Sequence, residues 1–417
     1  MIPMISASTI YSTLGNNSSL IPLAIKDIAN SCGLTTASYM AGDKFEGKDR
    51  FIDEFGTQAI WLGGIPTYKF ILGKLLCFPK NLDPNIDVRI FKDKGIIEAA
   101  KEFAPTKEIQ SAIENAAKNK KYLKNITMAK FIASTALTAL TYLGLTKFRH
   151  KYTENQIKKE YFAQKDEIET CKNISFTGGI QDFMFDPVRN LMIVDGVITG
   201  ERLTHARNPQ DLTGYVIKEG SFWAFMYLAG PMISKALERH SEKYFNKSID
   251  LDARVIESEQ LKQSFADGSM AKHLEAFKLA DKSNIDMYRF AVNPETDNLV
   301  VEIAKKSDII TLYEKSGQVD TRKYIDLSDL RGIANKIEKL FGQYEASGET
   351  IDEFFKSVRK LKRLSVIKNM GACIAALGVI SPLIMLAIRK FSKDSDYQVK
   401  KDVEAKLAQS NNSSTDE

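Results

Sequence analysis

The stretch NMGACIAALGVISPLIMLAI, residues 369–388, decides the fold of this 417-residue chain. Its twenty residues carry no charged side chain, and Lys368 and Arg389 bracket them. An α-helix rises about 1.5 Å per residue, so a helix of this length crosses the roughly 30 Å hydrocarbon core of a bilayer. The stretch predicts a membrane-spanning helix, and we expect a mostly α-helical integral membrane protein with two related halves and a small α+β insertion.

Three further apolar segments are shorter or interrupted, near residues 55–78, 131–146 and 220–236. Residues 131–146 contain no charge, whereas Gly63-Gly64-Ile65-Pro66 and Gly230-Pro231 are expected to break the helices that contain them. Segments of this length are either membrane-inserted or buried core helices of a soluble domain. The second alternative stays open, as a soluble helical interaction protein whose apolar helices are all core.

Composition excludes several classes of function. The chain is 44% hydrophobic and 27% charged with a formal charge of +5, so any embedded part must be local. Its four cysteines are far apart, so they predict neither a zinc site nor a disulfide framework, and we expect no metal or cofactor. The basic residues cluster beside apolar segments, which favours the lipid bilayer and its anionic headgroups over nucleic acid. The two clusters are Lys118, Lys120, Lys121 and Lys124, and Lys356, Arg359, Lys360, Lys362, Arg363 and Lys368.

An internal repeat is the second prediction. Each of the apolar stretches at 131–146 and 369–388 has a Lys-Asn pair near its start and a Lys-Phe pair near its end. The spacing from the first pair to the second differs by one residue between the two stretches. The segment RFIDEFGT around Glu54 also resembles YVIKEGS around Glu219, and a tryptophan and a Gly/Pro pair follow each. We expect half one at 24–150, a charged amphipathic linker helix at 151–179, and half two at 180–392 with the insertion near 245–327. The alternative is coincidence between simple helical patterns.

A duplicated pair of interrupted and continuous apolar helices is typical of transporters, which bind at the interruptions. Glu54 and Glu219 are then the candidate binding residues, because a buried intramembrane carboxylate can bind a cation or relay a proton. The alternative is that both glutamates flank helix starts at the water interface. The predicted role is non-enzymatic and membrane-located, in membrane organisation or in transport of a small ion or solute.

The rival class is a membrane-associated enzyme acting on lipid. No nucleotide-binding, zinc-protease or serine-hydrolase motif occurs in the sequence, and no residue is proposed as catalytic. Asp186, Arg189, Arg202 and His205 form a polar constellation that could frame a phosphate or headgroup site. The alternative is an ordinary loop in which these acids and bases pair and cap helices.

The remaining segments carry weaker predictions. Residues 1–23 are expected to be polar and irregular, and residues 393–417 to be a polar, disordered tail. In the insertion, the β-branched runs at 299–303 and 309–315 predict a small hairpin or sheet. Gly371 and Ala375 place small side chains one helical turn apart, a spacing that permits self-association of helices in lipid.

Overall fold

The computed structural model describes residues 7–16, 19–41, 43–162, 187–314, 316–391 and 397–413. These residues are almost entirely helical, which confirms the mostly α-helical prediction. The chain divides into two compact units. Unit 1 contains Met1–Asn16, Gly73–Ala129 and Ile233–Asn369; unit 2 contains Asn17–Leu72, Lys130–Met232 and Met370–Glu417.

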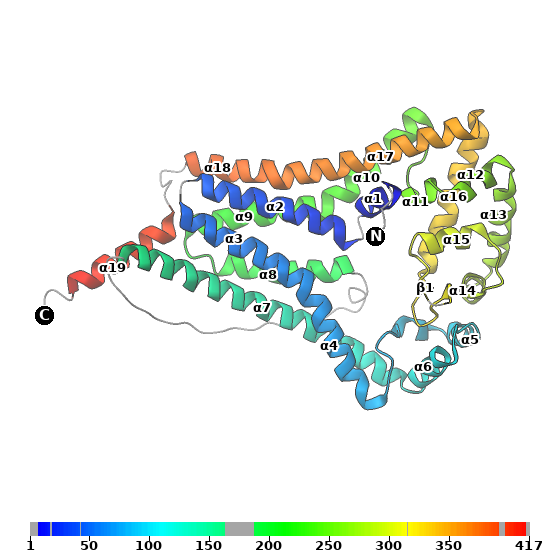
Figure 1. Cartoon of the computed structure of the whole chain (residues 1–417), viewed down its shortest axis with the longest axis horizontal. Helices are drawn as coiled ribbons and strands as arrows, with labels where there is room; N and C mark the ends of the chain where they lie inside the picture. Colours follow the sequence, from blue (N-terminus) through cyan, green and yellow to red (C-terminus); the bar gives the residue numbers. More distant parts are fainter. Residues whose placement is uncertain are drawn as a thin grey trace, which may run out of the picture. The chain divides into compact units, whose positions relative to one another are not determined.

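Unit 2 is built from two helical hairpins and two long helices that run alongside them (Figure 1). The first hairpin is α2 (Leu20–Met40) and α3 (Lys44–Ala59), and the second is α8 (Pro187–Thr204) and α9 (Pro209–Trp223). One long helix is α7 (Lys120–Phe162), which belongs to unit 2 from Lys130 on. The other runs from α17 (Ile351–Ala375) through η6 (Ala376–Ile380) into α18 (Ser381–Phe391) and belongs to unit 2 from Met370 on. Helix α19 (Gln398–Ser413) completes the unit.

The long helices contact the hairpins in a reciprocal pattern. Helix α7 contacts α3 and α8, through Leu145 beside Gly56 and through Tyr142 in an apolar cluster with Val194. Helices η6 and α18 contact α2 and α9. Exchanging α2 with α8, α3 with α9, and α7 with α18 leaves this set of contacts unchanged.

In the described part of unit 2, three π-helical turns, in which the helix is wider than an α-helix, interrupt the long apolar helices. They are η1 (Ile60–Gly64), between α3 and α4 (Ile65–Cys77), η5 (Ala224–Leu228), between α9 and α10 (Ala229–Phe245), and η6. A proline follows each turn within three residues: Pro66, Pro231 and Pro382. Proline cannot donate to the carbonyl four residues earlier and its ring crowds that carbonyl, which in all three cases lies inside the π turn. The prediction that Gly63-Gly64-Ile65-Pro66 and Gly230-Pro231 break their helices was therefore wrong, because the helix widens at these points and continues.

Unit 1 has an ordinary apolar core. It comprises α1 (Ala7–Gly15), η2 (Phe78–Lys80), η3 (Val88–Lys92), α5 (Lys94–Glu102), α6 (Lys107–Lys118), α11 (Ala253–Ile256), α12 (Glu259–Ala266), α13 (Ser269–Ala280), α14 (Asn284–Val292), α15 (Leu299–Lys306) and α16 (Leu327–Ser347), with adjoining parts of α4, α7, α10 and α17. Leu330, Ile337 and Phe354 are among its fully buried side chains. The 73–129 segment joins this core, because Ile90 and Ile113 pack in the same cluster.

The predicted strand at 299–303 was wrong. These residues form α15, whose side chains Val300, Val301 and Ile303 are buried and whose first turn is capped by Asn298. Packing of one helical face against the core outweighs the strand preference of its valines. The expected sheet reduces to β1 (Leu312–Tyr313) and β2 (Gln318–Val319), an antiparallel pair.

Both chain ends contain helices where irregular structure was expected. In the N-terminal segment α1 forms, and Ser19 caps the start of α2. In the tail α19 forms, and Val399 and Val403 pack with Phe45 and Ile157 in a small apolar cluster. A few apolar side chains spaced along one face suffice to dock an otherwise polar helix.

The two units distribute polarity differently. Unit 1 buries a large apolar core and leaves fewer large apolar side chains exposed, Phe78 and Leu279 among them, whereas unit 2 buries many charges and exposes many apolar side chains along its helices. Two helical stretches of the described residues, Lys120–Tyr161 and Ile351–Lys390, are long and apolar enough to cross a membrane, and 28% of each apolar window is buried. The exposed apolar side chains of unit 2 include Ile28, Phe51, Leu62, Phe70, Ile132, Leu140, Phe148, Val216, Leu228, Met232, Val379, Ile380, Leu383 and Ile384.

Candidate functional site: a buried charge cluster

The centre of unit 2 is a network of ion pairs around Asp53 of α3. One Asp53 oxygen lies 3.0 Å from Arg149 Nη1 of α7, and the other accepts a hydrogen bond of 3.1 Å from Arg202 Nη2 of α8. Lys218 Nζ of α9 lies 3.5 Å from the same carboxylate. Asp53, Arg149 and Lys218 are all at least 98% buried. Four helices therefore meet at one carboxylate.

Glu54 and Glu219 extend the network around Lys218. The Lys218 ammonium lies 2.7 Å from Glu54 Oε1 and 3.8 Å from Glu219 Oε1. Arg202 Nη1 donates a hydrogen bond of 2.6 Å to Glu219, which also accepts one of 2.6 Å from Thr199. Removing charges from water is costly, and it is offset only where each charge gains close partners. Each charge of the network has an opposite charge within ion-pair distance, while Asp53 Oδ2, Glu54 Oε1 and Lys218 Nζ make no hydrogen bond within the described ranges.

The spacing of α3 explains why so many charges face inward. Residues three and four apart lie on one face of a helix, so Asp49, Arg50, Asp53 and Glu54 all project from the same side. Asp49 accepts from Arg207 Nη2 at 2.8 Å and from the Thr153 hydroxyl at 2.7 Å. The opposite side of α3 carries Phe51, which is 50% exposed. Along residues 49–54 this helix is polar on its buried side, with Phe51 on its exposed side.

Helices α3 and α9 match without a gap at a fixed offset of 165 residues. Their N-caps, Asp43 and Asn208, have this offset, and so do Glu54 and Glu219, and Pro66 and Pro231. Residues at matched positions also contact each other. Arg50 lies over the ring of Tyr215 at 5.5 Å, and Asp53 lies 3.5 Å from Lys218. Contacts between equivalent residues are what a two-fold axis between the two helices produces.

A small polar cavity lies beside the cluster. Asp27, Asn30, Glu54, Asp195 and Glu219 are among its lining residues, and its volume of about 20 Å³ is enough for one water molecule. Asp27 accepts from Trp61 at 3.0 Å, and Asp195 accepts from Tyr227. Neither carboxylate has an ion-pair partner among the described residues. The Asn30 side chain is fully buried, and neither of its amide atoms has a hydrogen-bond partner within the described ranges.

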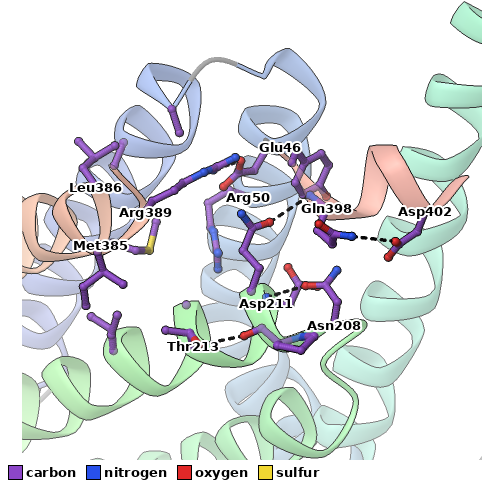
Figure 2. A pocket seen from close by; sticks show the side chains of 18 residues that line it. Glu46, Arg50, Asn208, Asp211, Thr213, Met385, Leu386, Arg389, Gln398 and Asp402 are labelled. Carbon is purple, nitrogen blue, oxygen red and sulfur yellow. Dashed lines mark hydrogen bonds and ion pairs between the residues drawn. The ribbon is translucent and has the colours of Figure 1, made fainter. Parts of the chain in front are cut away.

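A larger pocket opens where α3 and α9 begin and α18 ends (Figure 2). Its volume of about 580 Å³ lies within the range of small-molecule sites. Ile217, Met385 and Leu386 give it an apolar wall, and Arg50 and Asp211 contribute to a polar one. Arg50 therefore belongs to both the charge cluster and this pocket.

Three of the predicted site residues are brought together, and the others are not. Glu54, Glu219 and Arg202 meet in the cluster. The His205 side chain is 52% exposed and contacts Glu201 of α8. Arg189 is exposed near the start of the same helix. Asp186 lies outside the described residues. His205 therefore does not join Arg202 in the cluster.

Three residues of the cluster were not predicted from the sequence: Asp53, Arg149 and Lys218. Asp53 and Lys218 stand next to the two chosen glutamates, and their matched positions with opposite charge were a usable signal. Arg149 follows an apolar stretch directly, so it reads as a flanking residue, whereas it is 2% exposed inside the unit. The cluster could have been found by looking for charged residues that share one face of a helix whose opposite face is apolar.

No protein-family model, curated protein or solved structure matches this chain.

Proposed function

We propose that this chain is an integral membrane protein whose unit 2 lies in the bilayer and moves a small ion or solute. The observation that carries the proposal is the inverted polarity of unit 2. A soluble unit would bury its apolar residues and expose its charges to water. A unit in lipid has apolar surroundings, so its charges must be paired inside the protein. The embedding rests on the exposed apolar surface, and the transport role rests on the charge cluster.

The proposal includes an internal duplication. The reciprocal helix contacts and the fixed offset between α3 and α9 support two related halves joined about a pseudo-two-fold axis. Transporters commonly place their sites between such halves. Here α3 and α9 both contribute residues to the charge cluster and to the small cavity, and Glu54 and Glu219 both lie close to Lys218.

Bilayer contact is proposed to extend to the basic residues of unit 1. Lys118, Lys120, Lys121 and Lys124 are exposed, as an anionic headgroup surface requires. Gly371 and Ala375 are also exposed, and space around the Gly371 Cα is open, which leaves that face of α17 available to a second copy of the chain. Both interactions belong to the proposed membrane location.

The embedding is tested by washing membranes of expressing cells with high salt and then with carbonate. We expect the full chain to stay in the membrane fraction, and full-length protein in the soluble fraction without detergent would refute the embedding.

Transport is tested with purified protein in liposomes that contain a pH-sensitive dye and carry a potassium diffusion potential. The proton is the probe, because the cavity combines unpaired carboxylates with room for one water molecule. We expect proton flux in the wild type and at least tenfold less in Asp195→Asn, which keeps the side-chain volume and removes the charge. The exposed Asp308→Asn in unit 1 is the control and should retain flux. Equal flux in empty and protein-containing liposomes would refute proton movement while leaving the embedding intact.

A further inference from the structure

Helix α4 ends in apolar side chains that the core of unit 1 does not cover. Leu75 is 64% exposed on its last turn, and Phe78, in the η2 turn that follows, is 85% exposed. No large apolar side chain of the described residues is more exposed than Phe78. Nearby Leu82 and Ile86, by contrast, are buried in the core of unit 1. Neighbouring exposed apolar side chains of this size are typical of a surface that contacts another molecule or a membrane.

The end of α6 and the start of α7 lie beside these apolar side chains. The Tyr122 hydroxyl donates a hydrogen bond of 3.0 Å to the Leu76 carbonyl oxygen, and Asn115 Nδ2 donates one of 2.9 Å to the Asn81 carbonyl oxygen. Figure 1 shows the end of α4 beside the start of α7. Residues 74–81 and 115–124 of unit 1 are together called the tip. Its exposed basic residues are Lys74, Lys80, Lys118, Lys120, Lys121 and Lys124.

The charge of the tip has one sign. Neither 65–82 nor 115–130 contains an aspartate or a glutamate. The nearest acids along the chain are Glu114 and Asp83, and Asp83 pairs with Arg322 Nη1 at 2.8 Å. Lys80 and the four lysines at 118–124 form no ion pair within the described ranges. Such a surface attracts an anionic partner and repels a cationic one.

Two observations favour a bilayer over a nucleic acid as the anionic partner. Leu75 and Phe78 gain from leaving water for an apolar phase, which a bilayer provides directly below its phosphates. The exposed apolar side chains also continue back along the same helix, through Phe70 and Leu62, to the exposed apolar surface of unit 2. Lysines around exposed apolar side chains are typical of segments that lie in the headgroup layer of an anionic membrane.

We propose that the tip is a second membrane contact, in which Leu75 and Phe78 insert below the headgroups and the lysines bind anionic lipids. The proposal deepens the membrane location proposed above and rests on it for the presence of a bilayer. Insertion of the apolar side chains is added to the headgroup contact of the lysines at 118–124, and the lipid class that unit 1 selects is named.

Insertion is tested with the purified full chain in nanodiscs of phosphatidylcholine and phosphatidylglycerol. Phe78→Trp adds a tryptophan at the tip to the two that the chain already has. We expect the emission that it adds to the wild-type spectrum to be quenched when the phosphatidylcholine carries bromine on its acyl chains. Leu279→Trp, on α13 of unit 1, is the matched control, because Leu279 is also exposed and its added emission should stay unquenched.

Lipid selection is tested by native mass spectrometry of the lipid retained from nanodiscs that contain the two lipids in equal amounts. We expect the wild type to retain an excess of phosphatidylglycerol. A variant without the basic charges of α6 and α7 should retain about a third as much phosphatidylglycerol, because the attraction to its phosphate is lost. This variant carries Lys118→Gln, Lys120→Gln, Lys121→Gln and Lys124→Gln.

The matched control removes as many charges elsewhere on the surface of unit 1 and should retain the wild-type amount of phosphatidylglycerol. It carries Lys272→Gln, Lys278→Gln, Lys282→Gln and Lys306→Gln. The side chains altered in both variants are exposed, so the core of unit 1 stays intact, and circular dichroism checks this.

Unquenched emission from Phe78→Trp, or unchanged phosphatidylglycerol retention in the variant at 118–124, would overturn the proposal. Binding of an RNA oligonucleotide that this variant loses, without quenching at residue 78, would assign the tip to nucleic acid instead. These outcomes concern the tip alone. Quenching at residue 78 in a chain that carbonate removes from membranes would support the tip as a peripheral contact and refute only the embedding of unit 2.

Discussion

Replacing Leu140 with arginine distinguishes whether α7 faces lipid or water. Leu140 lies near the middle of the apolar stretch 131–146, and its side chain is 53% exposed. In water, an exposed leucine replaced by arginine changes the free energy of unfolding by about 0.5 kcal/mol or less. In hydrocarbon the same guanidinium costs about 2.5–3.5 kcal/mol, or roughly a hundredfold in the folding equilibrium. We expect the larger value.

The assay is unfolding of the full chain in bicelles by titration with sodium dodecyl sulfate. Both tryptophans of the chain, Trp61 and Trp223, lie in unit 2, so their emission reports on that unit and circular dichroism reports on both. Leu279→Arg is the matched control, because Leu279 is 63% exposed on α13 of unit 1 and should tolerate arginine. If Leu140→Arg unfolds within 0.5 kcal/mol of the wild type, or if Leu279→Arg costs as much, the reasoning from inverted polarity fails.

Three further substitutions test the packing of the two units. Asp53→Asn should lower the free energy of unfolding of unit 2 by about 3–5 kcal/mol, because it leaves buried cations without their shared partner. Tryptophan emission during detergent unfolding measures this, and a loss below about 1 kcal/mol would contradict a tightly paired network. Gly33→Val should prevent stable packing of α2 against η6, because even a Cβ at Gly33 would collide with the Gly378 carbonyl oxygen. Size-exclusion profiles and thermal melting of the variant check this, and a melting temperature equal to that of the wild type would show that the helices are not this close. Leu330→Ala should cost unit 1 about 2–5 kcal/mol by leaving a cavity in its core, as followed by circular dichroism, and a neutral effect would mean that Leu330 is not packed as described.

The helical architecture was predictable because its signals are long and local. The charge-free stretch at 369–388 and the weaker one at 131–146 both fall within long helices, α17–η6–α18 and α7. The π turns were not predictable from Gly and Pro alone, since those residues ordinarily end helices. Pro66 and Pro382 stay within continuous helices because a wider turn moves the crowded carbonyl aside. That accommodation depends on the whole backbone path, which local sequence does not specify.

The candidate site was partly predictable for a related reason. Glu54 and Glu219 were selected because their surroundings match, and matching is visible along the sequence. Arg149 and Arg202 join them from other helices, and such long-range convergence leaves no spacing signal. The strand predicted at 299–303 shows the same difficulty, because burial against distant helices decides between α and β for a short β-branched run.

The opposite charges of Asp53 and Lys218 have a consequence for how such a protein can originate. At an axis that relates two identical chains, each residue faces its own copy, so an aspartate there would meet another aspartate and a lysine another lysine. Like charges at about 3.5 Å inside a protein repel strongly. Only when the two halves are encoded separately, after a duplication, can the two positions diverge to acid and base. If the halves descend from one ancestor, that ancestor could not have carried this pair, and duplication preceded the charges that now hold the centre together. Neither half on its own should form a stable symmetric dimer.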